Sequence, residues 1–155
     1  MPAPENLCLA VREWVQKADD DLEVAVRLLK SGHGCPCDPI CYHAQQCVEK
    51  YLKARLVLEG KVFRKTHNLA ELVALLPQPL RPHLSLEEER ILTSHATVFR
   101  YPGDHETSSM SEARAAVRTA QRVRGQIRMT FPSTCLTPER NNRRIGISVT
   151  SPEEK

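Results

Sequence analysis

ICYHAQQCVEKYLKARLVL, residues 40–58, places apolar side chains at the three- and four-residue spacing that gathers them on one face of a helix. This spacing predicts an amphipathic helix of roughly 20 residues, about 30 Å long. We expect Asp38 to cap the start of this helix and Pro39 to be its first residue. Gly60 can adopt the left-handed conformation that ends a helix. Because such a helix is as long as a small domain is wide, we expect the rest of the chain to pack beside it.

Four further segments combine helical periodicity with residues that begin or end helices. Asn68, Ser85 and Ser109 are each followed three residues later by Glu, which resembles a capping box at a helix start. The predicted helices cover about residues 6–31, 68–76, 85–100 and 109–127. No strand pattern is sustained beyond a brief alternation at residues 144–149.

The composition limits the fold to one domain. A chain of 155 residues with 41% hydrophobic residues can bury a core but is too short for two sizeable domains. We therefore predict an all-α fold, an up-and-down helical bundle of four to five helices at residues 6–130. A short, irregular and flexible C-terminal tail is predicted at residues 131–155, where polar residues dominate.

Membrane and secretion signals are not recognisable in the sequence. No apolar run is long enough for a membrane helix, and residues 1–14 carry charges where a signal peptide needs an apolar block. We therefore expect a soluble, cytoplasmic protein whose six cysteines are reduced thiols.

Residues 33–43, HGCPCDPICYH, contain Cys35, Cys37 and Cys41 between two histidines. These side chains would suffice as zinc ligands, but their spacing lacks the two pairs of ligands found in zinc ribbons and fingers. We interpret the segment as an ordinary loop between helices, and predict no metal site and no cofactor.

Five arginines and a single glutamate lie between residues 110 and 130. Arg114, Arg118 and Arg122 recur every four residues and therefore share one face of the predicted helix. Two interpretations remain open for this face. It is either a solvated stripe or a surface that contacts phosphates.

Arg100 and His105 bracket the break between the last two predicted helices, in the sequence RYPGDH. A permanently charged guanidinium and a titratable imidazole thus lie on one short turn, just before a helix N-terminus, which attracts anions. This combination suits a phosphate group. Cleavage of RNA without a metal needs a base, an acid and a cation of this kind.

The remaining histidines are interpreted without a catalytic role. His95 lies on the apolar side of its helix and is expected to be a satisfied core histidine. His67 is expected to hydrogen-bond the backbone near the next helix start. His33 and His83 are expected to be exposed to solvent.

Taken in order, several short motifs resemble those of the HEPN domain family. They are Trp14, Lys17-Ala18 and Asp21-Leu22, YHAQQCVEKYLKA at 42–54, KTHNL at 65–69 and RYP at 100–102. The resemblance covers about residues 6–127. It implies a dimeric bundle of four or five helices, in agreement with the periodicity.

Many members of this family are metal-independent endoribonucleases that carry an arginine followed, after four to six residues, by a histidine. Arg100 and His105 match this signature. The resemblance thus implies a homodimer in which one His105 acts as base, its dimer mate acts as acid, and Arg100 steadies the phosphate. It also implies a toxin of a toxin–antitoxin pair, whose partner is a minimal nucleotidyltransferase.

An alternative rests on departures from that pattern. Tyr101-Pro102 follows the arginine where active members usually have a small polar residue, and Thr107 stands where some such toxins carry a modified tyrosine. The chain is then a non-catalytic nucleotide-binding or partner-docking module. Its phosphate- or nucleotide-binding residues would be Lys50, Lys53, Lys65, Arg100 and Tyr101.

Dimerisation is also predicted from the small residues of the last helix. Ala113, Ala116 and Ala120 fall on one face and let another helix approach closely. We expect this face to leave apolar surface that a second subunit covers.

Overall fold

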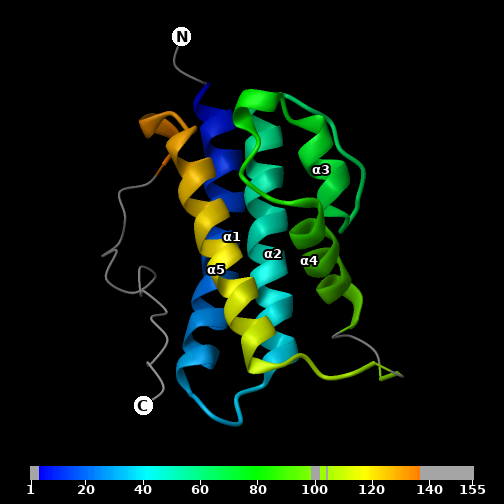
Figure 1. Ribbon diagram of the computed structural model, residues 1–155. Coiled ribbons are helices and arrows are strands. Elements are labelled where there is room, and N and C mark those ends of the chain that lie inside the picture. The colour runs from blue at the N-terminus through cyan, green and yellow to red at the C-terminus, as the bar shows by residue number, and fades with distance from the viewer. Residues whose placement is uncertain (1–3, 99–101, 104, 137–155) are drawn as a thin grey trace.

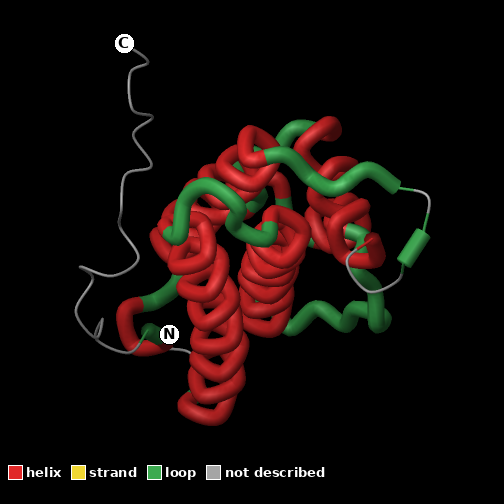
Figure 2. Tube along the Cα trace, turned by 90° about the horizontal axis from the view of Figure 1, so that it is seen from below, coloured by secondary structure: helices red, strands yellow, loops and turns green. Residues whose placement is uncertain are grey.

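The structure, a computed structural model, describes residues 4–98, 102–103 and 105–136. Its helices and 3₁₀ turns, in chain order, are α1 (Glu5–Lys30), α2 (Cys37–Leu58), α3 (Leu69–Leu75), η1 (Gln78–Leu80), α4 (Leu86–Val98), α5 (Met110–Met129) and η2 (Ser133–Cys135). Within these ranges every regular element is helical (Figure 2). The predicted all-α class is therefore confirmed.

Helix α2 is the centre of the bundle. It contacts each of the other four α-helices. Helices α1 and α5 pack along it, and α3 and α4 cover its remaining side (Figure 1). Between Ala44 and Leu56, every α2 side chain except that of Lys50 is buried. A helix surrounded in this way contributes side chains to the core on all sides. Its apolar spacing predicts burial of only one face.

The boundaries of α4 and α5 follow the predicted capping boxes. The Glu112 backbone N–H donates to Ser109 Oγ, and the Glu112 carboxylate accepts from the Ser109 N–H. Ser85 and Glu88 make the same reciprocal pair. At α3 the box is half formed, because Asn68 accepts from the helix backbone while Arg64 holds the Glu71 carboxylate. These hydrogen bonds satisfy donors that a helix start leaves unpaired.

Two expectations about helix α2 have different outcomes. Gly60 does adopt a left-handed conformation, with φ of 67°, directly after the helix. Asp38, however, is not the cap, because α2 begins at Cys37 and no side chain caps it. Asp38 Oδ1 instead accepts a hydrogen bond of 2.8 Å from the Ser108 N–H, which ties the start of α2 to the segment before α5.

The small residues of α5 are covered within the chain itself. Ala113, Ala116 and Ala120 are all buried, and α5 packs against α2 and α1. The expectation that the alanine face leaves apolar surface for a second subunit is therefore wrong. Small side chains here serve close contact between helices of one bundle.

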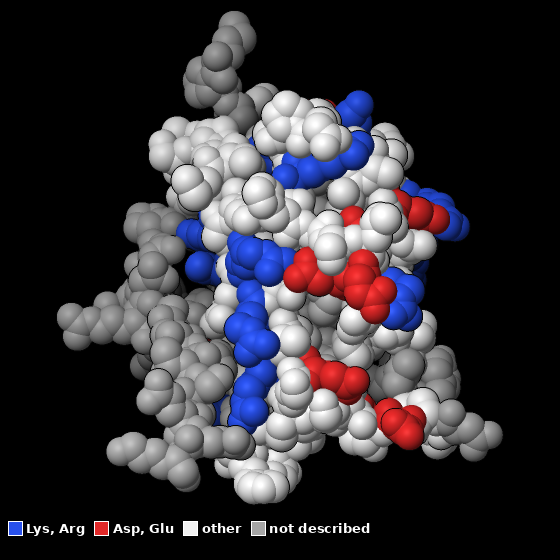
Figure 3. All heavy atoms as spheres, in the orientation of Figure 1, with Lys and Arg blue, Asp and Glu red and all other residues white. Residues whose placement is uncertain are grey.

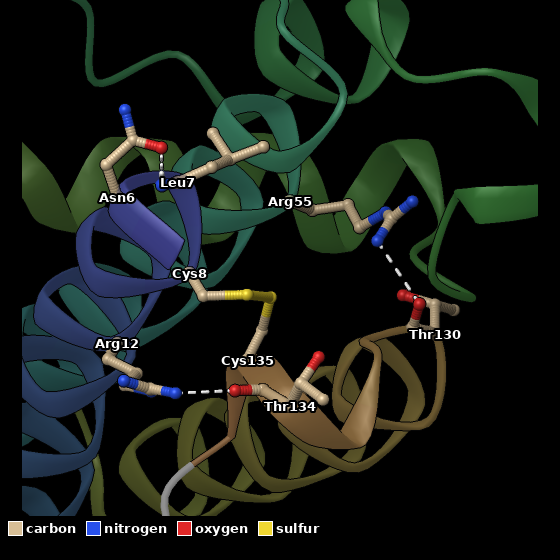
Figure 4. The surroundings of a disulfide bond; sticks show 8 residues. All are labelled: Asn6, Leu7, Cys8, Arg12, Arg55, Thr130, Thr134 and Cys135. Carbon is tan, nitrogen blue, oxygen red and sulfur yellow. Dashed lines mark hydrogen bonds between the residues drawn. A yellow bond between two sulfur atoms is a disulfide. The ribbon is translucent and has the colours of Figure 1, made fainter. Parts of the chain in front are cut away.

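The chain remains packed beyond α5, further than the boundary predicted at residue 130. Phe131 and Cys135 are buried, and Cys135 forms a disulfide with Cys8 of α1 (Figure 4). The expectation of six reduced thiols is thus wrong for these two, whose Cα atoms lie 4.5 Å apart. Residues 137–155, with the brief alternation at 144–149, lie outside the described residues.

Among the helices of the described ranges, none combines the length and hydropathy that crossing a bilayer requires.

Candidate functional site

His105 lies in the segment between α4 and α5, at the end of the bundle where α2 begins. Its side chain is exposed, and its backbone N–H donates to the Gly103 carbonyl at 2.9 Å. The imidazole makes no hydrogen bond or ion pair with any described residue. Arg100 and Tyr101 lie outside the described residues.

The Asp38 carboxylate fixes the chain close to His105. Burial alone would raise the pKa of Asp38, but hydrogen bonding to Ser108 and the nearby imidazoles of His105 and His95 lower it. The carboxylate therefore stays charged and holds Ser108 at neutral pH. This contact joins positions 70 residues apart and anchors the end of the segment that carries His105.

Three backbone donors at the start of α5 are used within the protein. Asp38 accepts from Ser108 and Glu112 accepts from Ser109, while Ser109 Oγ accepts from Glu112. The helix N-terminus was predicted to attract a phosphate group. These three N–H groups are therefore not available to an anion at this end.

Helix α5 presents a basic face to solvent. Figure 3 shows a column of Lys and Arg side chains running along α5, with acidic side chains on the α4 side of it. Arg122 is held inside this arrangement, because its Nη2 donates to both carboxylate oxygens of Glu88 at 2.8 Å. Arg114 is half-buried and Arg118 is exposed, and neither has an acidic partner among the described residues.

The other two arginines of α5 face the bundle. Arg124 donates to Asp19 at 2.9 Å, and Arg128 lies 3.6 Å from the same carboxylate. Tyr51 of α2 also donates to Asp19, at 2.5 Å. The five arginines of α5 are thus divided between an internal contact with α1, made by Arg124 and Arg128, and the outward face predicted for Arg114, Arg118 and Arg122.

The three lysines predicted to contact phosphates do not lie together as free cations. Lys53 is buried, and its Nζ is 2.7 Å from Glu49. The same ammonium group faces the rings of Trp14 and Phe63. Lys50 pairs with Asp21 of α1. Lys65 is exposed and has no partner among the described residues.

Glu49 is the centre of a buried polar cluster that was not predicted from the sequence. Its carboxylate accepts from Gln45 at 2.9 Å and from Gln46 at 3.2 Å, and contacts His67 Nδ1 at 3.0 Å. Burial would raise the pKa of Glu49, but hydrogen bonds from Lys53, Gln45 and His67 lower it. His67 was expected to bond the backbone and instead binds this carboxylate. The spacing of Gln45, Glu49 and Lys53 at every fourth residue was the available signal.

His95 of α4 is half-buried rather than fully enclosed. Burial lowers its pKa, so the neutral ring is favoured. Its Nε2 is buried without a hydrogen-bond partner among the described residues, which differs from the satisfied core histidine that we predicted. His33 and His83 are exposed, as expected.

Comparison with known proteins identifies the family. The family model of the HEPN domain, which describes the sequences of its members, matches residues 11–129. The chain therefore belongs to the HEPN domain family. Two solved structures share the fold. TT1696 from Thermus thermophilus is 26% identical, with a TM-score of 0.67 over 78% of this chain and 98% of that chain. ST0689, an archaeal HEPN homologue, is 24% identical, with a TM-score of 0.60 over 77% of this chain and 95% of that chain.

A curated relative matches a shorter region. It is "Putative toxin MJ1304" of Methanocaldococcus jannaschii, 48% identical over 52 residues. The match covers 34% of this chain and 32% of the relative, so the chain spans about a third of that relative's length.

Proposed function

We propose that this HEPN protein is a toxin-type endoribonuclease that cleaves RNA without a metal ion. The observation that carries the proposal is the exposed His105 ring, which no described residue binds. It lies at the end of the bundle where α5 begins, and α5 carries Arg114 and Arg118 without acidic partners in the described part of the chain. The resemblance of one region to a protein named as a toxin supports the same class.

The chemistry follows from the imidazole group, which can both take and give a proton. One His105 takes the proton from the ribose 2′-hydroxyl as its oxygen attacks phosphorus. The bond from phosphorus to the 5′-oxygen breaks, and a second, protonated imidazole gives that oxygen a proton. The products are a 2′,3′-cyclic phosphate and a 5′-hydroxyl, and Arg100 would offset the charge that develops on the phosphate.

The second imidazole requires a second subunit, so the proposal includes a homodimer. His105 of the partner subunit would act as acid across a shared cleft. The alanine face of α5 is buried within the chain and therefore gives no support for a dimer. The dimer is supported by the family resemblance alone. Sedimentation of a monomer at micromolar concentration would contradict this part of the proposal. Action in the cytoplasm, beside a minimal nucleotidyltransferase, stays a prediction.

The test is cleavage of structured RNA in the presence of a chelator. We expect His105→Ala to lower the rate by about 10²- to 10⁴-fold, because general acid–base catalysis contributes that much. His33→Ala, which removes an exposed imidazole from the loop before α2, should cleave like the wild type. Equal cleavage by wild type and His105→Ala, or cleavage by neither, would reject the ribonuclease.

The second candidate is a non-catalytic module that binds a nucleotide or docks a nucleotidyltransferase. Lys65 favours it. This lysine was predicted to contact phosphate, it is exposed, and its ammonium group has no partner among the described residues. Lys50 and Lys53 do not favour it, since both are held by carboxylates. A protein that leaves RNA intact but binds ATP, with heat lost in Arg100→Ala, would support this candidate.

A further inference from the structure

A pocket of about 230 Å³ lies at the end of the bundle where α5 finishes. It opens between the last turns of α5 and the segment from η1 to α4, which lie side by side (Figure 1). Helix α5 begins at the other end of the bundle, directly after the segment that carries His105. The lining of the pocket combines apolar and polar side chains, and includes Pro79, Pro82 and Met129 together with Arg81, His83 and Gln126.

One wall of the pocket is fixed to α5 by two hydrogen bonds. The His83 N–H donates to Gln126 Oε1 at 2.7 Å, and Arg122 Nε donates to the His83 carbonyl at 3.2 Å. Because a backbone N–H only donates, the oxygen of the Gln126 amide is the end that holds His83. The NH₂ group of Gln126 has no partner among the described residues and is left for a ligand.

Two further groups of the lining suit a flat ring. The Arg81 guanidinium donates through Nε to the Leu76 carbonyl at 2.9 Å and through Nη2 to the Ala74 carbonyl at 3.3 Å, so its plane is held in place. Met129 is 88% exposed, although its side chain is apolar and adaptable. Unpaired RNA bases stack on guanidinium planes and hydrogen-bond through their edges. The pocket therefore offers a surface for stacking and, in Gln126, a donor for the edge of a base.

The pocket continues the basic face of α5. Arg114, Arg118 and Arg122 recur every four residues, and Gln126 is the next position of the same row. Gln126 lies about two turns beyond Arg118, roughly 12 Å along the helix axis. Arg118 is exposed and has no acidic partner in the described part of the chain. A strand whose phosphates follow this face would bring a base to the pocket.

We propose that the pocket receives an unpaired base of single-stranded RNA whose phosphates contact the outward arginines of α5. The positive charge beside the pocket favours a ligand that carries phosphates over an uncharged ring. A base site at one end of α5 would determine how the strand lies relative to His105 at the other end. The inference rests on the proposed function, because it takes RNA as the substrate, and adds a binding site away from the reacting phosphate.

The test measures binding of a single-stranded RNA of about ten nucleotides, within the site sizes of other single-strand binders, in a His105→Ala background that prevents cleavage. The RNA is compared with a copy that keeps every ribose and phosphate but lacks the bases. We expect the intact RNA to bind about 5- to 100-fold more tightly, because one stacked base contributes that much affinity. This ratio of affinities is the preference for bases.

Variants of the lining separate the pocket from the basic face. Met129→Ala should lower the preference for bases about threefold or more, because it removes apolar contact area. Gln126→Glu keeps the acceptor for the His83 N–H, loses the amide donor, and should also lower the preference. Arg118→Met should weaken both RNAs equally, since both carry the phosphates. Val62→Ala, which truncates an exposed apolar side chain between α2 and α3, should bind both RNAs like the parent.

The exposure of Met129 means that Met129→Ala is expected to fold like the parent, which keeps the test valid. Equal binding of the intact and base-free RNAs by the parent would overturn the pocket. So would an unchanged preference in Met129→Ala and Gln126→Glu. The cleavage assay remains separate: a chain that prefers bases but never cleaves RNA keeps the pocket and loses only the ribonuclease.

Discussion

Lys53 shows how a charged side chain can belong to the core of this fold. Its ammonium contacts Glu49 and lies 5.7 Å from the Trp14 ring centroid and 5.8 Å from that of Phe63. Glu49 is 3% exposed and keeps its charge because Gln45 and His67 also bind it. Desolvation opposes such a pair, and its remaining hydrogen-bonding positions must be filled for it to be tolerated.

We predict that Lys53→Met lowers the free energy of unfolding by about 3 kcal/mol, because the buried Glu49 carboxylate loses its charged partner. Urea unfolding monitored by circular dichroism measures this change. Lys65→Met is the matched control, since Lys65 is exposed, and should change the free energy by less than about 0.5 kcal/mol. Equal effects of the two substitutions would show that the pair contributes nothing specific.

Helix α5 divides its arginines between packing and solvent. Arg124 and Arg128 contact Asp19 of α1, while Arg122 holds Glu88 and donates to the His83 carbonyl at 3.2 Å. Arg118 lies on the same outward face as Arg122, one turn earlier, but has no acidic partner among the described residues. One helix therefore offers two similar arginines, of which one is used internally and the other is available for a ligand.

This difference predicts that replacing arginine by methionine affects RNA binding at position 118 and stability at position 122. Arg118→Met should leave stability unchanged and weaken RNA binding, lowering the slope of log K against log salt by about 0.7 to 0.9 for one lost phosphate contact. Arg122→Met should lower the free energy of unfolding by about 0.5 to 1 kcal/mol, because it breaks the contact with α4. Binding is measured in a His105→Ala background, so that RNA stays intact. An unchanged salt slope in Arg118→Met would show that this face does not contact phosphate.

Helices were predictable because their signals are local. The apolar spacing of α2 and the boxes at Ser85 and Ser109 require residues only three or four positions apart. The environment of each polar group was not predictable in this way. Lys53 was interpreted as a surface cation because nothing near it in the sequence reveals that Trp14 and Phe63 cover it.

Contacts across the whole molecule set the limits of the sequence analysis. Asp38 has the side chain and the position expected of a helix cap, but its hydrogen-bond partner, Ser108, lies 70 residues away in the sequence. Cys8 and Cys135 are separated by 127 residues, and no local pattern distinguishes them from the four free cysteines. His105 was predicted from its spacing to Arg100, whereas only the structure shows that its ring is exposed and that none of the described residues binds it.

The Cys8–Cys135 bond closes nearly the whole chain into one loop. Arg12 of α1 also donates to the Thr134 carbonyl at 2.5 Å, and Arg55 of α2 donates to the Thr130 carbonyl at 3.2 Å (Figure 4). The segment after α5 is thus attached to the bundle by a covalent bond and two hydrogen bonds. The covalent bond acts mainly by restricting the unfolded chain, more so for longer loops.

We predict that reduction of this disulfide lowers the free energy of unfolding by about 2 to 4 kcal/mol and the unfolding temperature by roughly 5 to 15 °C. Thiol titration in denaturant should find four reactive cysteines before reduction and six after it. Cys8→Ala with Cys135→Ala should unfold at a temperature that the reductant does not change, whereas Cys47→Ala, which keeps the bond, should remain sensitive. A wild type with six titrated thiols and an unshifted unfolding temperature would mean that the two hydrogen bonds and the burial of Phe131 hold the segment without the disulfide.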